Sequence, residues 1–194
     1  FAICAVTFEC VFCMLAADAL ERLGIARGSY RMRVNNRKIL DGVLETAGVD
    51  PLSSANAAQR LVVLRAMDKF DRLGRSGVEL LLGNGRKDDS GDFTEGAKLD
   101  NRSIAVILDY ITTPAGGRAE TLAAIGKLVA SSEAGRTGVD ELSKMSELLT
   151  AAGYAEDRVI VDPSIVRGLE YYTGPVFEAE LTFAAKIDAG AVSR

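Results

Sequence analysis

The sequence predicts an α+β fold, and three observations support this prediction. Short runs at 31–34 and 159–161 carry the alternating or β-branched side chains of strands. Longer segments place apolar residues three and four positions apart, which is the spacing of one helix face. Between the strands, residues 51–138 show helical spacing and turn-rich pieces but no convincing strand. We therefore predict core parts at 1–50 and 139–194, interrupted by a helical insertion at 51–138.

The opening segment is apolar but predicts no membrane span. Its longest charge-free run is too short to cross a bilayer, and Glu9 interrupts it. We expect a buried strand that runs into an amphipathic helix ending at Gly24. The predicted inward residues of that helix are Phe12, Leu15, Ala16, Ala19, Leu20 and Leu23.

Further elements follow from the same patterns. Residues 38–47 and 139–154 are predicted helices that flank the insertion, and Asn35 and Asn36 mark a turn or a helix start. The predicted helices of the insertion are 61–73, 78–82, 104–110 and 121–130, with turns at 83–91 and 113–117. The charged residues Arg31, Arg33, Arg37 and Lys38 are expected to be solvated or paired within the chain, with phosphate binding as the alternative.

Composition excludes several classes of protein. The 194 residues are 48% apolar, which is ordinary for a globular fold, and carry a formal charge of −4 with a pI near 5.0. A general basic nucleic-acid binder is thereby excluded, although a local basic patch is not. The chain contains no histidine, so imidazole bases and His-dependent triads are excluded as well.

The three cysteines, Cys4, Cys10 and Cys13, lie close together near the start. The Cys10-x-x-Cys13 spacing suggests metal or redox chemistry. With no second pair and no histidine, however, a four-ligand zinc site lacks its usual donors. We predict buried, reduced cysteines and no protein-bound metal.

The run from Val166 to Glu178 concentrates more chemistry than any other part of the chain. The guanidinium of Arg167 is a fixed positive fork that suits a carboxylate or a phosphate and cannot accept a proton. In a strand, Tyr171 and Tyr172 point to opposite faces, so one ring packs while the other offers its hydroxyl to a ligand. The alternative reading is a hairpin with a surface arginine and two half-buried tyrosines.

Residues 167–178, RGLEYYTGPVFE, resemble the histidine-specific signature of histidyl-tRNA synthetases, in which aspartate is more frequent than glutamate at Glu170. A second block, residues 20–42, resembles the helix, strand and asparagine-arginine turn that follow motif 2 in that family. Both blocks stand in the family's order and are separated by about the length of its helical insertion. The resemblance implies part of a class II synthetase core, an antiparallel sheet with flanking helices.

The resemblance also implies an activity and its residues. Histidine and ATP would form histidyl-adenylate, and the histidyl group would pass to tRNA(His). Arg167 matches the signature arginine that contacts the α-phosphate and the carboxylate, which makes it the expected catalytic residue. Tyr171 and Tyr172 match the tyrosines of the histidine pocket, where Gly168 and Gly174 permit a close backbone approach or a positive φ.

The family's insertion domain contacts the acceptor arm of tRNA. Arg60, Arg65, Lys69 and Arg72 are accordingly the predicted tRNA contacts, with ordinary solvated helix faces as the alternative. Arg75, Arg86 and Lys87 are further cations of this region, whereas Asp68, Asp71, Asp88 and Asp89 dilute its charge. The resemblance further implies Mg²⁺ with ATP, for which no protein ligand is identifiable, a homodimer, a cytoplasmic location and no membrane partner.

The chain departs from the family mainly by absences. Nothing in it resembles motifs 1, 2 or 3 or the anticodon-binding domain, and Phe1 to Val6 lacks the acidic residues that the family places there to read the substrate. We therefore expect this chain to be an incomplete portion of the enzyme. One alternative is a non-catalytic histidine-binding paralogue, such as the regulatory subunit of ATP phosphoribosyltransferase; another is a helical module that binds only tRNA or protein.

Overall fold

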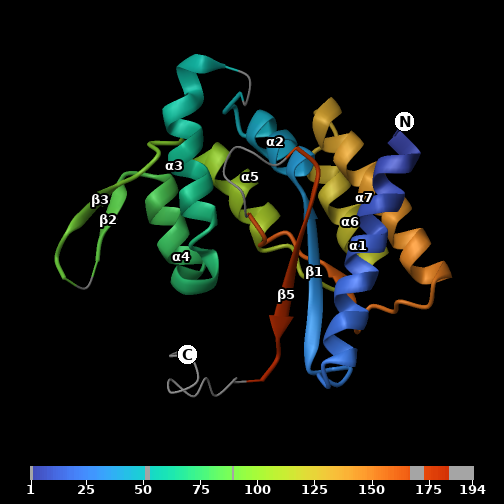
Figure 1. Cartoon of the computed structure of the whole chain (residues 1–194). Helices are drawn as coiled ribbons and strands as arrows, with labels where there is room; N and C mark the ends of the chain where they lie inside the picture. The colour runs from blue at the N-terminus through green and yellow to red at the C-terminus, as the bar shows by residue number, and fades with distance from the viewer. Residues whose placement is uncertain (1, 51–52, 89, 167–172, 184–194) are drawn as a thin grey trace.

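The computed structural model describes residues 2–50, 53–88, 90–166 and 173–183, with side chains from Val6 onward. In the three-stranded sheet, β1 (Tyr30–Asn36) lies between β4 (Val159–Val161) and β5 (Pro175–Leu181) (Figure 1). Helices surround this sheet on the route from β1 to β4. The predicted α+β class is therefore confirmed, and so are the strands predicted at 31–34 and 159–161.

The prediction of an antiparallel sheet is only partly correct. β1 and β5 do run antiparallel, with Val34 opposite Phe177, but β1 and β4 run parallel, with Val34 opposite Val161. Parallel neighbours require a crossover connection, whereas antiparallel neighbours can be joined by a tight turn. The helices between residues 37 and 158 provide that crossover.

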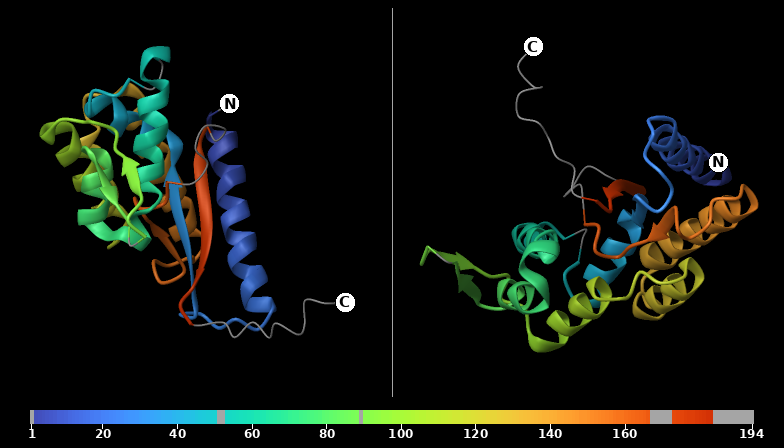
Figure 2. Two further views of the ribbon diagram at one scale, coloured as in Figure 1. Left: turned by 90° about the vertical axis from the view of Figure 1, so that its left-hand side faces the viewer. Right: turned by 90° about the horizontal axis from the view of Figure 1, so that it is seen from below.

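Seven α-helices and one hairpin complete the described part of the chain. Figure 1 shows α3, α4 and the hairpin on one side of the sheet and α1, α6 and α7 on the other, with α2 and α5 between them. The two further views in Figure 2 show the hairpin projecting away from the sheet. The elements are α1 (Ala2–Arg22), α2 (Arg37–Thr46), α3 (Ala57–Met67), α4 (Phe70–Leu82), α5 (Asn101–Ile111), α6 (Arg118–Leu128), α7 (Glu133–Ala151), a 3-10 turn (Ser54–Asn56), β2 (Gly85–Lys87) and β3 (Phe93–Glu95).

Helix α1 corrects two predictions about the start of the chain. The predicted strand is wrong, because Ala2–Arg22 is one continuous helix. The predicted inward face is correct only for Ala16 and Leu20, which pack against the core, since Phe12 and Leu15 are 54% and 58% exposed. Apolar residues occupy every side of this segment, so their spacing alone did not determine the covered side. The buried positions are Val6, Cys10, Cys13 and Ala17. Within the described residues no helix, α1 included, is long and apolar enough to cross a membrane.

The helical stretch differs from the prediction in two places. The helix predicted at 61–73 is divided, because α3 ends at Met67 and α4 begins at Phe70. A bend follows within α4 at Gly74, whose φ of 64° lies in the left-handed region that favours glycine. The turn predicted at 83–91 contains β2, which pairs with β3 just beyond it in a short hairpin; a Cβ on Gly85 would lie 2.2 Å from the carbonyl oxygen of Thr94. Three-residue strands without alternating apolar residues leave no recognisable pattern.

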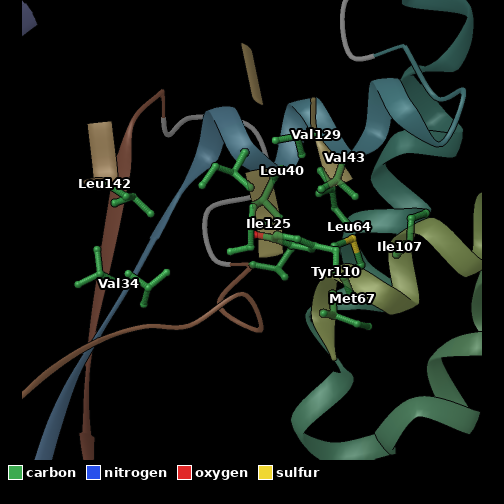
Figure 3. Close-up of a cluster of buried hydrophobic side chains, with 14 of the residues drawn as sticks. Val34, Leu40, Val43, Leu64, Met67, Ile107, Tyr110, Ile125, Val129 and Leu142 are labelled. Atoms are coloured by element: carbon green, nitrogen blue, oxygen red, sulfur yellow. The ribbon is translucent and has the colours of Figure 1, made fainter. Parts of the chain in front are cut away.

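One hydrophobic core joins the sheet to the helical stretch. In Figure 3, Val34 of β1 and Leu40 of α2 share a cluster with Leu64 of α3 and Tyr110 of α5. Helix α7 also continues through position 138, the predicted end of the insertion. The boundaries at 50 and 138 stay predictions.

Helices α2 and α7 approach closely because glycines face each other. A Cβ on Gly42 would lie 2.5 Å from the Cα of Gly135, and a Cβ on Gly138 would lie 2.8 Å from the backbone nitrogen of Ile39. Any side chain at these glycines would force the helices apart. The close approach brings Glu141 of α7 next to the start of α2, where the site described below begins.

Candidate functional site

Both described ends of the signature run lie at the same end of the sheet. The carboxyl ends of β1 and β4 meet there because these strands are parallel, and β5 begins there because it is antiparallel to β1. Val166, which is buried, follows β4, and Gly174 precedes β5. The backbone N–H of Arg37 donates to the carbonyl oxygen of Gly174 at 2.9 Å. Ile165, just before the signature run, and Gly174, within it, therefore both bond to residues of the segment 35–37.

The structure places only one of the five predicted signature residues. Arg167, Gly168, Tyr171 and Tyr172 lie outside the described residues, so their roles stay predictions. Gly174 is described: a Cβ there would lie 3.4 Å from Oε1 of Glu9, an ordinary contact distance, so its predicted role in the histidine pocket stays a prediction. Gly174 is not among the glycines with a positive φ.

A polar cluster surrounds the end of β1. Asn36 is fully buried; its Oδ1 accepts from the backbone N–H of Lys38 at 3.0 Å and so caps α2, while its Nδ2 donates to Oε2 of Glu141 at 2.8 Å. The ammonium of Lys38 donates to the other oxygen of Glu141. An N-capping asparagine thus connects the end of β1 to α7.

Glu9 of α1 completes this cluster next to Gly174. Burial raises the pKa of Glu9, the nearby carboxylate of Glu141 raises it further, and Lys38 opposes the rise. The carboxylates of Glu9 and Glu141 thus both lie near the Lys38 ammonium, and Glu9 lies next to Gly174. Such an arrangement favours a cationic or hydrogen-bond-donating ligand.

The remaining cations of this region are paired, as predicted for Arg33, Arg37 and Lys38. The Arg37 side chain is 7% exposed, and its Nε lies 3.0 Å from Oδ1 of Asp41. Nε of Arg33 lies 2.8 Å from Oδ2 of Asp162, with both side chains nearly buried. Burial raises the pKa of Asp162, but hydrogen bonds from Arg33 and Ser164 outweigh it, so the pKa lies below its usual value.

A second candidate site is a basic groove between α3, α4 and the hairpin. A cavity of about 390 Å³ is lined by Lys69, Arg72 and Arg86. A neighbouring cavity of about 230 Å³ shares Lys69 and adds Arg65. Among the residues that the structure describes, none of these four side chains has a carboxylate within ion-pair distance. We call this surface the basic groove; its lining also includes Asp88 and Glu95.

The groove contains three of the four predicted tRNA contacts. Arg65, Lys69 and Arg72 line it, whereas Arg60 does not. Burial raises the pKa of Asp41, and the charge of Arg60, after that of Arg37, opposes this rise. Arg86 joins the groove because β2 folds back along α4, and the hairpin that positions it was not predicted. Asp88 remains a negative charge at this groove, because hydrogen bonds from Ser90 lower the pKa of its carboxyl.

Cys10 and Cys13 have the predicted buried character, whereas the side chain of Cys4 lies outside the described residues. Cys10 and Cys13 are free thiols, each 1% exposed, on the side of α1 that faces α7. Burial raises the pKa of Cys13 to about 12, which keeps the thiol protonated at neutral pH and poorly nucleophilic. These residues therefore serve packing.

Comparisons with known proteins identify the family to which this chain belongs. A family model described as histidyl-tRNA synthetase matches residues 6–186. A histidine–tRNA ligase from Methylocella silvestris is 51% identical over 186 residues, which cover 96% of this chain and 36% of the relative. A histidine–tRNA ligase from Brucella ovis is 54% identical over 178 residues, which cover 92% of this chain and 35% of the relative. The chain belongs to the histidyl-tRNA synthetase family and spans about a third of the length of these relatives.

Solved structures share the fold. A histidyl-tRNA synthetase from Nostoc aligns with a TM-score of 0.71 at 22% identity, covering 91% of this chain and 37% of that one. A protein from Bacillus halodurans, described as an ATP phosphoribosyltransferase regulatory subunit/histidyl-tRNA synthetase, aligns with a TM-score of 0.63 at 21% identity, covering 96% and 41%. At this identity the likeness concerns the fold alone.

Proposed function

We propose that the protein carrying this chain is a histidine-tRNA ligase, which activates histidine with ATP and transfers the histidyl group to tRNA(His). One observation carries the proposal: this chain is 51% and 54% identical to two relatives that bear the name histidine–tRNA ligase, over more than nine-tenths of its length. The intact run RGLEYYTG supports histidine as the amino acid.

The chemistry depends on charge stabilisation more than on a protein nucleophile. The histidine carboxylate attacks the α-phosphate of ATP, and pyrophosphate leaves. Arg167 is the residue that we propose to neutralise the charge that develops on the α-phosphate. Tyr171 and Tyr172, with Gly168 and Gly174, would form the wall of the histidine pocket. The end of β1 supports this assignment, because Val166 and Gly174 frame the signature run there.

The basic groove is the surface that we propose for tRNA. Lys69 and Arg72 at the start of α4 and Arg86 of β2 line one cavity, and cations without carboxylate partners among the described residues can neutralise backbone phosphates. Arg65 extends the groove along α3. Arg60 is the weakest of the predicted contacts, since it lies near Asp41.

Three further expectations belong to the same proposal. Mg²⁺ accompanies ATP as a substrate complex; within the described ranges, no group of three His, Cys, Asp or Glu side chains fits a metal ion, so we assign no ligand to this chain. The protein is expected to be a cytoplasmic homodimer. Its mass in solution, measured by light scattering, tests the dimer.

Histidine-dependent ATP–pyrophosphate exchange by the protein that carries this chain tests the proposed activity. Exchange with histidine, but not with other amino acids, is the expected result. Histidine binding without exchange would contradict it in favour of the regulatory paralogue. Loss of both exchange and binding, with tRNA binding retained, would indicate a module that binds only nucleic acid.

A further inference from the structure

Two buried side chains of β1 hold the chain segment that leads into the signature run. Arg33 and Asn35 stand two positions apart and therefore project from the same face of the strand. Both reach across to the segment that follows β4. Nη2 of Arg33 donates to Oγ of Ser164 at 2.7 Å, and Nδ2 of Asn35 donates to the carbonyl oxygen of Ile165 at 2.8 Å.

The orientation of the Asn35 amide is fixed by its surroundings. The backbone N–H of Asn36 can only donate, and it lies 2.8 Å from Oδ1 of Asn35, which must therefore be the acceptor. Nδ2 consequently faces Ile165 and also lies 2.8 Å from the hydroxyl of Tyr110, a fully buried residue of α5. Asn35 itself is 0% exposed, so its hydrogen bonds have no competition from water.

The segment from Asp162 to Val166 is short and largely buried, and it ends where the signature begins. Ile165 and Val166 are 3% and 1% exposed, and the N–H of Asp162 donates to the carbonyl oxygen of Val34 at 2.9 Å. Only one peptide bond separates Val166 from Arg167. Arg167 therefore follows a buried pair of residues directly in the chain.

We propose that Asn35, oriented by Tyr110, is a positioning residue for adenylation and acts through Arg167. This inference rests on the proposed function, in which Arg167 stabilises charge on the α-phosphate. Tyr110 of helix α5 holds the Asn35 amide, and the amide holds the carbonyl of Ile165, two positions before Arg167 in the chain. Asn35 and Tyr110 would therefore affect the reaction through the position of the signature run. The nearby pair of Arg33 and Asp162 holds the same segment from its other end.

A double-mutant cycle on histidine-dependent exchange tests this proposal. Asn35→Asp is nearly isosteric but has no donor for the Ile165 carbonyl. Because a misplacement of about 1 Å costs on the order of 10²-fold in rate, we expect kcat to fall by roughly that factor, with the KM for histidine changed by less than about threefold. In an Arg167→Ala background, Asn35→Asp should cost less than about twofold, since a positioning residue has nothing left to position.

Tyr30→Phe is the matched control. Tyr30 is as buried as Tyr110 and also loses a bonded hydroxyl, but that hydroxyl donates to Glu21 at 2.7 Å and accepts from Arg158, away from the signature. We expect kcat to be unchanged in this variant. If Asn35→Asp does not fold, Tyr110→Phe replaces it in the same cycle, with a smaller expected loss in kcat of about 5- to 10-fold.

The outcomes separate the two proposals. If Arg167→Ala is impaired and Asn35→Asp costs the same factor in both backgrounds, the positioning role is overturned and the proposed activity stands. If Arg167→Ala exchanges as fast as the wild type, the assignment of Arg167 fails, and the positioning role fails with it. A loss of kcat in Tyr30→Phe equal to that in Tyr110→Phe would also overturn the positioning role, because the loss of any buried tyrosine hydroxyl would then lower kcat.

Discussion

The cations at the end of β1 and the cations of the basic groove differ in what surrounds them. Arg33 and Lys38 each have a carboxylate partner and a largely covered side chain. Lys69 and Arg86 have no carboxylate within ion-pair distance in the part of the chain that the structure describes. A paired, buried cation holds the protein together, whereas an unpaired cation in a groove is available to a ligand. Substitutions in the first set should therefore change stability, and substitutions in the second set should change binding.

The largest expected effect is the loss of stability in Arg33→Ala. The substitution leaves the Asp162 carboxylate nearly buried without its guanidinium partner, which costs roughly 3–5 kcal/mol for a buried pair. Urea denaturation of the protein that carries this chain measures the free energy of unfolding. Arg31→Ala is the control, since Arg31 is exposed on the same strand and should have little effect. Equal losses in both variants would mean that the pairing of Arg33 contributes nothing.

The next effect concerns RNA affinity and the groove. Replacing Lys69, Arg72 and Arg86 with alanine should weaken tRNA binding on the order of 10²-fold near 0.1 M salt and should reduce the salt slope by about 0.7–0.9 for each lost phosphate contact. The free energy of unfolding should not change. Filter binding over a range of salt concentrations measures the slope.

A matched triple variant serves as the control for the groove. Arg22, Lys127 and Lys144 are exposed cations on other helices, and their replacement removes the same net charge. It should leave the affinity nearly unchanged. If both triple variants lose affinity equally, the effect comes from net charge and the groove has no special role.

A third effect is the acid sensitivity of the paired region. The pKa of Asp162 in the folded protein lies below its usual value of 3.8, so its ion pair stabilises the fold above that pH and loses this contribution as the pH falls through the folded pKa. The stability difference between wild type and Asp162→Asn should therefore be constant near neutrality and should shrink below about pH 4. A difference independent of pH down to the lowest accessible value would contradict the lowered pKa.

The smallest effect should come from Glu9→Gln. Here a fall in pH should stabilise the wild type, whereas it should destabilise the wild type through Asp162. The pKa of Glu9 is raised above 4.5, so the folded state binds this proton more tightly than the unfolded state does. Wild-type stability should thus gain as the pH falls from the folded pKa toward 4.5, and Glu9→Gln should lack this gain. Thermal unfolding across that pH range measures it. An identical pH dependence in both proteins would show that Glu9 is not perturbed.

The sequence predicted those elements whose own residues show a clear helical or strand pattern. The apolar face of residues 38–47 predicts α2, and the β-branched run 159–161 predicts β4, because local propensity and burial agree there. The signature run, together with residues 20–42, identified the family by its resemblance to known sequence motifs. The sequence also predicted that Arg33 and Lys38 would be solvated or paired within the chain, but it did not predict which, nor their partners.

Other features depend on contacts between distant segments. Phe12 was expected inside and lies outside, because α1 is apolar on all sides and the packing of α7 selects the covered face. Arg86 enters the groove only because Gly85 permits a hairpin next to α4. In neither case does the local sequence predict which other segment these side chains will lie against.

The sequence by itself determined the α+β class, most of the helices and the family, because helical period, strand composition and a run of catalytic residue types are properties of neighbouring positions. Only the tertiary structure decided that β1 and β4 run parallel, that Asn35 bonds Ile165, 130 positions away, and that three elements converge on the basic groove. These features result from chain closure over long loops and from the burial of polar groups, which must find partners wherever the fold provides them.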